Sequence, residues 1–138
     1  MSKLVRMKGL PCSGKTEWAT EWAMKKPNRV RLSWSESMAI LGGRKLRLCK
    51  LVAFDGFLRM TQTALRLGLD VVVDECNLNG LEFGIVLVRA QLCGAKIEWH
   101  TMKRTADECK QRAREMGKEV NEMDIDRLAK KYEAWLKQ

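Results

Sequence analysis

The sequence has few of the residues from which metal centres and disulfide frameworks are built. His100 is the only histidine, so metal centres that need several histidines are excluded. The five cysteines are odd in number and widely separated, and no two of them form a CxxC pair. This spacing argues against both a disulfide framework and a zinc knuckle, and it indicates a reducing compartment. We therefore expect a cytoplasmic location.

Long hydrophobic runs are also missing. No stretch approaches the roughly 18 consecutive apolar residues that a membrane helix needs. The opening MSKLVRMKGL is too short and too charged for a secretory signal, so we expect neither export nor a membrane partner. The length of 138 residues, with 46% apolar and 31% charged side chains, indicates a single globular domain over residues 1–138.

Positive charge is in clear excess. Twenty-six Lys and Arg residues against seventeen Asp and Glu residues leave a net charge of +9. Such a field favours polyanionic partners, which include nucleic acid, nucleotides and anionic membrane surfaces. Charge alone does not choose among them.

The periodicity of apolar residues alternates between strand and helix. Val71, Val72 and Val73 are consecutive and bounded by polar residues, which is typical of a strand buried on both faces of a parallel sheet. The patterns predict strands at 3–10, 29–34, around 70–73 and 96–102, and helices at 16–26, 35–41, 48–67, 81–92, 105–116 and 123–137. This order indicates an α/β domain with a mostly parallel sheet.

Residues 9–16, GLPCSGKT, match the phosphate-binding pattern GxxxxGK[ST] and lie between a predicted strand and a predicted helix. Backbone N–H groups of such a loop surround the β-phosphate of a nucleotide. We expect Lys15 to reach the β- and γ-phosphates of ATP and the Thr16 hydroxyl to bind Mg²⁺. The candidate ATP-binding residues are Gly9, Pro11, Cys12, Ser13, Gly14, Lys15 and Thr16.

A second candidate for magnesium follows the valine-rich strand. Asp74 ends this strand, where P-loop proteins place the acid that holds the metal, and Glu75 is adjacent. Successive strand residues point to opposite sides, so one of the two faces the phosphates, and we favour Asp74.

These features together resemble the polynucleotide kinase-like P-loop kinases found in bacteriophages. The resemblance rests on GLPCSGKT, the polar loop after the second strand, DECNLN after the third, and an arginine-bearing helix that begins ADEC. It implies a P-loop kinase-like three-layer α/β/α fold and a place in the host cytoplasm if the chain is phage-encoded. It also implies that Asn77 lies near the phosphate acceptor. Cys12 stands where the family commonly has glycine.

The acceptor loop departs from the family pattern. Ser35 occupies the position of the usual catalytic Asp, and Met38 that of a family Arg. Glu36 is the nearest carboxylate that can accept the proton of the acceptor hydroxyl, although helix capping explains it nearly as well. Asp55 is the reserve candidate. Trp34, beside this loop, is either a packing residue or a face for stacking an unpaired base.

The basic segment at about 103–122 resembles the arginine-bearing lid of these kinases. Arg112 matches the family position best, and Arg114 is a possible substitute for a second arginine that this chain lacks near Met116. Arginines that close over the γ-phosphate stabilise transition-state charge. The alternative is a solvated basic helix face. We interpret Trp18, Trp22, Trp99 and Trp135 as packing residues and His100 as an ordinary strand residue.

The sequence thus predicts a kinase that transfers the γ-phosphate of ATP to a hydroxyl of nucleic acid, with DNA favoured. The acceptor is either a 5′-hydroxyl end or a hydroxymethyl group on a modified base such as 5-hydroxymethyluracil. The alternatives are a kinase for a small metabolite or nucleoside, and a nucleotide-binding regulator that transfers nothing. The oligomeric state is left open.

Overall fold

A computed structural model of the chain describes residues 1–42, 46–74, 80–118 and 121–136, with 132–136 described by their backbone. These residues form four strands and six helices. The strands are β1 (Lys3–Lys8), β2 (Arg29–Leu32), β3 (Asp70–Val73) and β4 (Lys96–Thr101). The helices are α1 (Lys15–Met24), α2 (Trp34–Ile40), α3 (Arg47–Arg66), α4 (Gly80–Leu92), α5 (Ala106–Glu115) and α6 (Glu122–Leu136).

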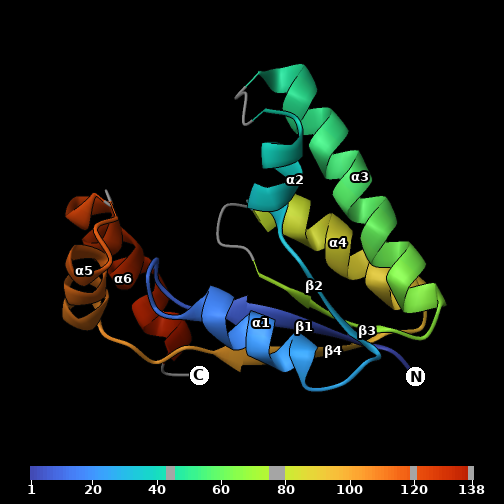
Figure 1. Cartoon of the computed structure of the whole chain (residues 1–138), viewed down its shortest axis with the longest axis horizontal. Coiled ribbons are helices and arrows are strands. Elements are labelled where there is room, and N and C mark those ends of the chain that lie inside the picture. The colour runs from blue at the N-terminus through green and yellow to red at the C-terminus, as the bar shows by residue number, and fades with distance from the viewer. Residues whose placement is uncertain (43–45, 75–79, 119–120, 137–138) are drawn as a thin grey trace.

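The four strands form one sheet in the order β2-β3-β1-β4, and every neighbouring pair is parallel (Figure 1). Leu4 is opposite Val71 in the β1–β3 pair and opposite Ile97 in the β1–β4 pair. The parallel α/β fold expected from the valine-rich strand is confirmed. Because all strands run the same way, the loops after β1, β2 and β3 emerge at one edge of the sheet.

Helices cover both faces of this sheet, which gives three layers (Figure 1). Side chains alternate along β1, so Val5 and Met7 pack with Ala19 of α1 on one face. Leu4 points to the other face, where it joins a larger core with residues such as Phe57 of α3 and Val86 of α4. Val72 and Val71 divide between the two faces in the same way. The consecutive valines are therefore buried because each face has its own helical cover.

Helices α5 and α6 form a separate group beyond the phosphate-binding loop (Figure 1). Buried Leu10, Cys109 and Ile125 pack together and join this group to the start of the loop. An ion pair of 2.7 Å between Lys110 and Asp126 links α5 to α6, and the hydrogen bond within it raises the pKa of Lys110. Among the described residues, the predicted lid segment corresponds to α5 and the turn that directly follows it.

The second strand is shorter than predicted. It ends at Leu32, and Ser33 caps α2 by accepting a hydrogen bond from the backbone N–H of Glu36. Trp34 therefore belongs to the helix rather than to the strand predicted over residues 29–34. None of the described helices is both long and apolar enough to cross a bilayer.

Candidate functional site: a phosphate-binding loop facing an arginine-bridged carboxylate pair

Close packing and unusual backbone angles shape the loop between β1 and α1. A Cβ atom added to Gly9 would lie 2.6 Å from Ser13 Oγ and 2.9 Å from Met102 Cβ, so any larger residue would force these neighbours to move. Gly14, at the start of α1, has φ of 94°, which favours glycine. Cys12 has φ of 62°, and holding a non-glycine residue there costs on the order of 1–2 kcal/mol. The conformation of the loop therefore depends on the small size of Gly9 and on the positive φ angles of Cys12 and Gly14.

Lys15 lies at the first turn of α1 and is 8% exposed. Its Nζ donates hydrogen bonds to the carbonyl oxygens of Gly9, at 2.7 Å, and Leu10, at 3.4 Å. The ammonium group is thus held across the loop whose amides the sequence predicts to bind phosphate. An anionic ligand there would meet this charge together with the positive end of the α1 dipole.

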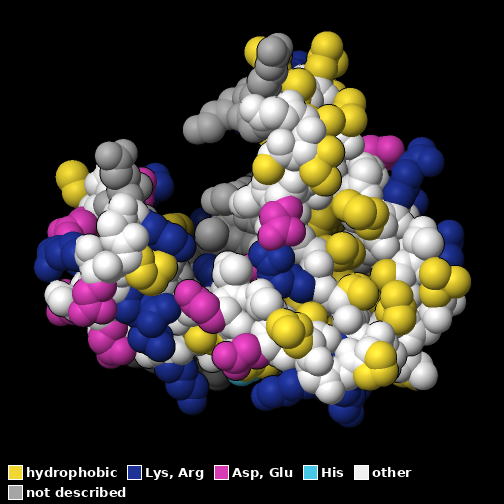
Figure 2. All heavy atoms as spheres, in the orientation of Figure 1, with side chains coloured by type: hydrophobic (Ala, Val, Ile, Leu, Met, Phe, Trp, Pro, Cys, Tyr) yellow, Lys and Arg dark blue, Asp and Glu magenta, His cyan; other side chains and the backbone are white. Residues whose placement is uncertain are grey.

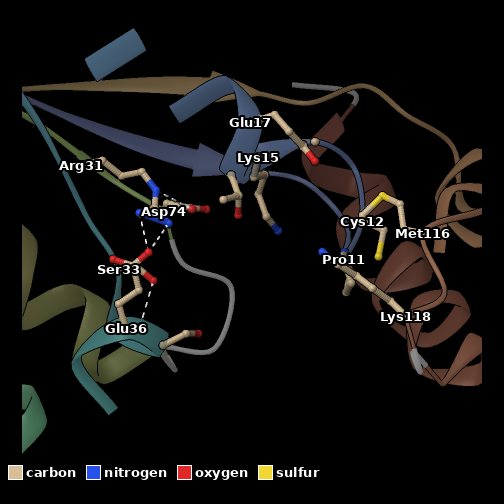
Figure 3. A pocket seen from close by; sticks show the side chains of 13 residues that line it. Pro11, Cys12, Lys15, Glu17, Arg31, Ser33, Glu36, Asp74, Met116 and Lys118 are labelled. Atoms are coloured by element: carbon tan, nitrogen blue, oxygen red, sulfur yellow. Dashed lines mark hydrogen bonds and ion pairs between the residues drawn. The ribbon is translucent and has the colours of Figure 1, made fainter. Parts of the chain in front are cut away.

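A pocket of about 280 Å³ opens beside this loop (Figure 3). Arg31, Ser33, Glu36 and Asp74 lie on one side, and Lys15 lies between them and the loop (Figure 3). The lining residues come from the loop and α1, from β2 and α2, from the end of β3, and from the turn after α5. They are Pro11, Cys12, Gly14, Lys15, Thr16, Glu17, Arg31, Ser33, Ser35, Glu36, Asp74, Met116 and Lys118. Figure 2 shows the hollow between the α5–α6 group and the end of the molecule that carries α2.

One arginine connects the two carboxylates on the far side of this pocket. Arg31 Nε lies 3.2 Å from Asp74 Oδ2, and both Nη atoms lie 2.7 Å from Glu36 Oε1. Asp74 is 7% exposed, so its charge needs a partner. Arg31 supplies the positive partner for Asp74. It also fixes the direction of the Glu36 carboxylate, whose side chain is 62% exposed.

The sheet register explains this contact. Arg31 pairs with Val72, and Asp74 lies two residues further along β3, so the two side chains point to the same face. This is the face that α1 covers, which brings Asp74 toward Lys15 and Thr16. Sequence reasoning missed Arg31 because its partner is distant in the chain. The sequence offered one sign of this role: Arg31 is a charged residue within a short predicted strand that leads into the acceptor loop.

The predicted lid arginines occupy different places. Arg112 reaches the loop, where its Nε donates to the carbonyl oxygen of Cys12 at 3.0 Å and its Nη2 lies 3.4 Å from Glu17 Oε1. Arg112 therefore holds the peptide whose backbone angle is unfavourable. Arg114 instead pairs with Glu122 of α6 at 2.7 Å, and neither arginine is among the residues that line the pocket. Lys118, which was not proposed for a role, does line the pocket.

Of the residues predicted to act on the acceptor, some line the pocket and others do not. Ser35 and Glu36 line the pocket, whereas Asp55 lies on α3, pairs with Arg59 at 2.9 Å and is not among the lining residues. Trp34 is 8% exposed and packs edge-on against Phe54 and Phe57. The stacking role considered for Trp34 is wrong for this structure, because a buried indole offers no free face to a base. Asn77 and Glu75 lie outside the described residues.

The aromatic side chains of β4, His100 and Trp99, make specific contacts. Trp18 stacks on His100 with ring centroids 3.6 Å apart, and burial lowers the pKa of His100. Trp99 is 45% exposed, and cations of Arg6 and Lys8 lie over its ring. Trp18 and Trp22 pack against the α1 face of the sheet, as their spacing predicted.

Comparison with known proteins shows the family to which the chain belongs. A family model described as an AAA domain matches residues 4–135, nearly the whole chain. The chain belongs to this AAA domain family. No curated protein matches it at a significant level.

Solved structures with the same fold as this AAA domain include two of a Pnkp1/Rnl/Hen1 complex. The one described as an RNA repair complex has a TM-score of 0.80 at 17% identity. The match covers 96% of this chain and 44% of the matched chain in that complex. The other has a TM-score of 0.71 at 18% identity, with coverages of 80% and 38%. A candidate kinase from Chloroflexus aurantiacus has a TM-score of 0.67 at 15% identity, with coverages of 91% and 73%. This AAA domain thus has a kinase-like P-loop fold. It spans less than half the length of the chains that it matches in the two Pnkp1/Rnl/Hen1 structures.

The residues of this AAA domain fit a magnesium–nucleotide ligand. Ser13 Oγ is fully buried beside the loop amides and has no hydrogen-bond partner among the described residues, the kind of orphaned polar atom found at functional sites. Thr16 and Asp74 line one pocket and offer hydroxyl and carboxylate oxygens, which Mg²⁺ prefers. The described residues contain no group of three metal-binding side chains. That suits Mg²⁺, which usually takes one or two protein ligands and completes its shell with phosphate and water.

Proposed function

We propose that this AAA domain transfers the γ-phosphate of ATP to a hydroxyl group of nucleic acid. The observation that carries the proposal is the composition of the pocket, in which Lys15 and Thr16 of the phosphate-binding side line the same hollow as Ser35, Glu36 and Asp74. A donor phosphate bound beside Lys15 and Thr16 and an acceptor hydroxyl bound beside Ser35 and Glu36 would meet in this pocket. The kinase-like P-loop fold supports the donor half of the proposal.

Each residue then has a distinct task. The loop amides and Lys15 bind the phosphates, Thr16 and Asp74 hold Mg²⁺, and Arg112 reaches the donor side from α5. Mg²⁺, when bound, supplies neutralising charge at the phosphate oxygens. Glu36 accepts the proton of the attacking hydroxyl, and Arg31 keeps the Glu36 carboxylate directed into the pocket. Arg114 pairs with Glu122, and it acts on the phosphates after this pair opens.

The class of acceptor follows from charge and from the family resemblance. A small anionic substrate needs only one or two cations inside a pocket, whereas a net charge of +9 suits a polymer of phosphates. The resemblance to phage polynucleotide kinases favours DNA, as a 5′-hydroxyl end or as a hydroxymethyl group on a modified base. RNA is named in the description of one similar structure and belongs in the same test.

The experiment offers γ-labelled ATP and magnesium with one acceptor at a time. The acceptors are 5′-hydroxyl DNA, 5′-hydroxyl RNA, DNA that contains 5-hydroxymethyluracil, and free nucleosides. We expect label on a polymer, with a rate that falls steeply as salt rises. Label on nucleosides alone, without salt dependence, would show a small-molecule kinase. ATP binding with no label on any acceptor would show a regulator.

A further inference from the structure

Helix α4 is apolar on its outer side as well as on its inner side. Phe83, Val86 and Ala90 are buried against the sheet and α3. On the outer side Leu81 is 77% exposed, Ile85 37%, Val88 56% and Leu92 77%. Hydrophobic side chains gather in Figure 2 over the part of the molecule where Figure 1 places α3 and α4. A helix with apolar residues on both sides is usually covered on both sides.

The outer residues have the spacing of a helix–helix seam. Leu81, Ile85, Val88 and Leu92 follow one another at intervals of four, three and four residues. This series of intervals is the same when read from either end. In an antiparallel pair about a two-fold axis, Leu81 would therefore meet Leu92 of the second copy, and Ile85 would meet its Val88. Such a seam is complementary to itself, as a two-fold interface requires.

Two glycines border the seam. Gly80 and Gly84 both have open space where a Cβ atom would stand, so nothing within the described chain requires glycine there. Gly84 lies inside the helix, where glycine weakens a helix relative to alanine. A shallow groove follows this side and is lined by Gly80, Leu81, Gly84, Ile85, Val88 and Arg89. Glycines beside an apolar seam allow a second helix to approach closely.

Charges on the opposite border of the seam favour a second copy as the occupant. Glu82 and Arg89 are two helical turns apart on the same side of α4 and are its only charged residues. The antiparallel register that joins Leu81 to Leu92 also brings Glu82 of each copy near Arg89 of the other. Because α4 carries no net charge, two chains of +9 can approach here without placing like charges in contact.

We infer that this protein self-associates through α4, with two copies packed antiparallel along Leu81, Ile85, Val88 and Leu92. The inference does not depend on the proposed kinase activity, because none of these residues lines the phosphate pocket.

Light scattering at a series of protein concentrations tests the inference. We expect a mass that rises toward twice 15.9 kDa and returns to 15.9 kDa on dilution. Val88→Glu should keep the protein at 15.9 kDa throughout. Val52→Glu is the matched control, because Val52 is 60% exposed on α3 and should leave the dimer intact. Circular dichroism confirms that both variants are folded.

A charge exchange tests the antiparallel register separately. Arg89→Glu should weaken the dimer by about tenfold or more, because it places like charges opposite Glu82. The double variant Glu82→Arg/Arg89→Glu should restore it. The inference is overturned by a monomer at every concentration, by a dimer that survives Val88→Glu, by equal loss in the Val52→Glu control, or by failure of the double variant. Binding of the monomer to lipid vesicles or to a different protein through α4 would also overturn it.

Discussion

The guanidinium of Arg31 lies between Asp74 and Glu36 and contacts both carboxylates. Its Nε is 3.2 Å from Asp74 Oδ2, and its Nη atoms are 2.7 Å from Glu36 Oε1. Asp74 directly follows β3, whereas Glu36 belongs to α2, so a single side chain connects the proposed metal ligand with the proposed base. A change at Arg31 should therefore affect both halves of the reaction.

Arg31→Gln should lower turnover by about 10- to 100-fold, because it removes charge-assisted hydrogen bonds worth about 1.5–3 kcal/mol. The same variant should shift the magnesium concentration needed for nucleotide binding, since Asp74 loses its charged neighbour. Turnover and magnesium-dependent nucleotide fluorescence measure the two effects. Arg31→Lys should recover part of both. Arg29→Gln is the control on the same strand, because Arg29 packs over Trp22 instead. Equal effects of the two glutamine variants would contradict the role of Arg31.

Gly9→Ala should disturb the phosphate-binding loop. The added methyl group would lie 2.6 Å from Ser13 Oγ and 2.9 Å from Met102 Cβ, and overpacking of this kind costs about 1–3 kcal/mol. We expect a lower midpoint of urea unfolding together with weaker ATP binding. Gly56→Ala is the matched control, because its Cβ would meet open space in the middle of α3. That variant should be neutral or gain up to about 1 kcal/mol. Tight ATP binding by Gly9→Ala would show that the loop tolerates the side chain.

Glu36→Gln should reduce turnover by about 10²-fold or more if this carboxylate accepts the proton. Asp55→Asn should leave turnover unchanged, because Asp55 pairs with Arg59 outside the pocket. Single-turnover transfer with saturating acceptor isolates the chemical step from binding. An unchanged rate in the first variant, or a large loss in the second, would reassign the base.

The stability of the fold should depend on pH through His100. Burial beside Trp18 lowers the pKa of His100 below its ordinary value of 6.5, so the folded state disfavours the protonated ring. The free energy of unfolding is therefore at its full value above about pH 6.5, the ordinary pKa of histidine. It falls as the pH drops from there through the lower pKa that His100 has in the folded state. Urea unfolding between about pH 5 and pH 7.5, followed by tryptophan fluorescence, measures the slope. His100→Gln should flatten it, and an unchanged slope would place its origin elsewhere.

Much of the fold could be predicted because its signals are local. Three consecutive valines indicated a doubly covered strand, and GLPCSGKT indicated a loop between a strand and a helix. Both features depend on residues that are close in the chain. The end of β2 was misplaced because Ser33 caps a helix that begins at Trp34, the residue at which the apolar pattern of the strand ends.

The second half of the site could not be predicted in the same way. Arg31 meets Asp74 only because β2 and β3 are neighbours in a particular register, and the pairing depends on residues that are about forty positions apart in the chain. The burial of Trp34 depends on Phe54 and Phe57 of α3, which pack against α2. Pairing of Arg114 with Glu122 likewise depends on how α6 folds back on α5.

The central claim is that the loop from Gly9 to Thr16 binds the phosphates of ATP, and calorimetry with ATP and magnesium tests it most directly. Lys15 Nζ lies across this loop at 2.7 Å from the Gly9 oxygen, so Lys15→Ala should weaken binding by about tenfold or more. Lys25→Ala, at the exposed end of α1, should bind like the natural chain. Equal affinity of the natural chain and Lys15→Ala, or no binding by either, would contradict the account.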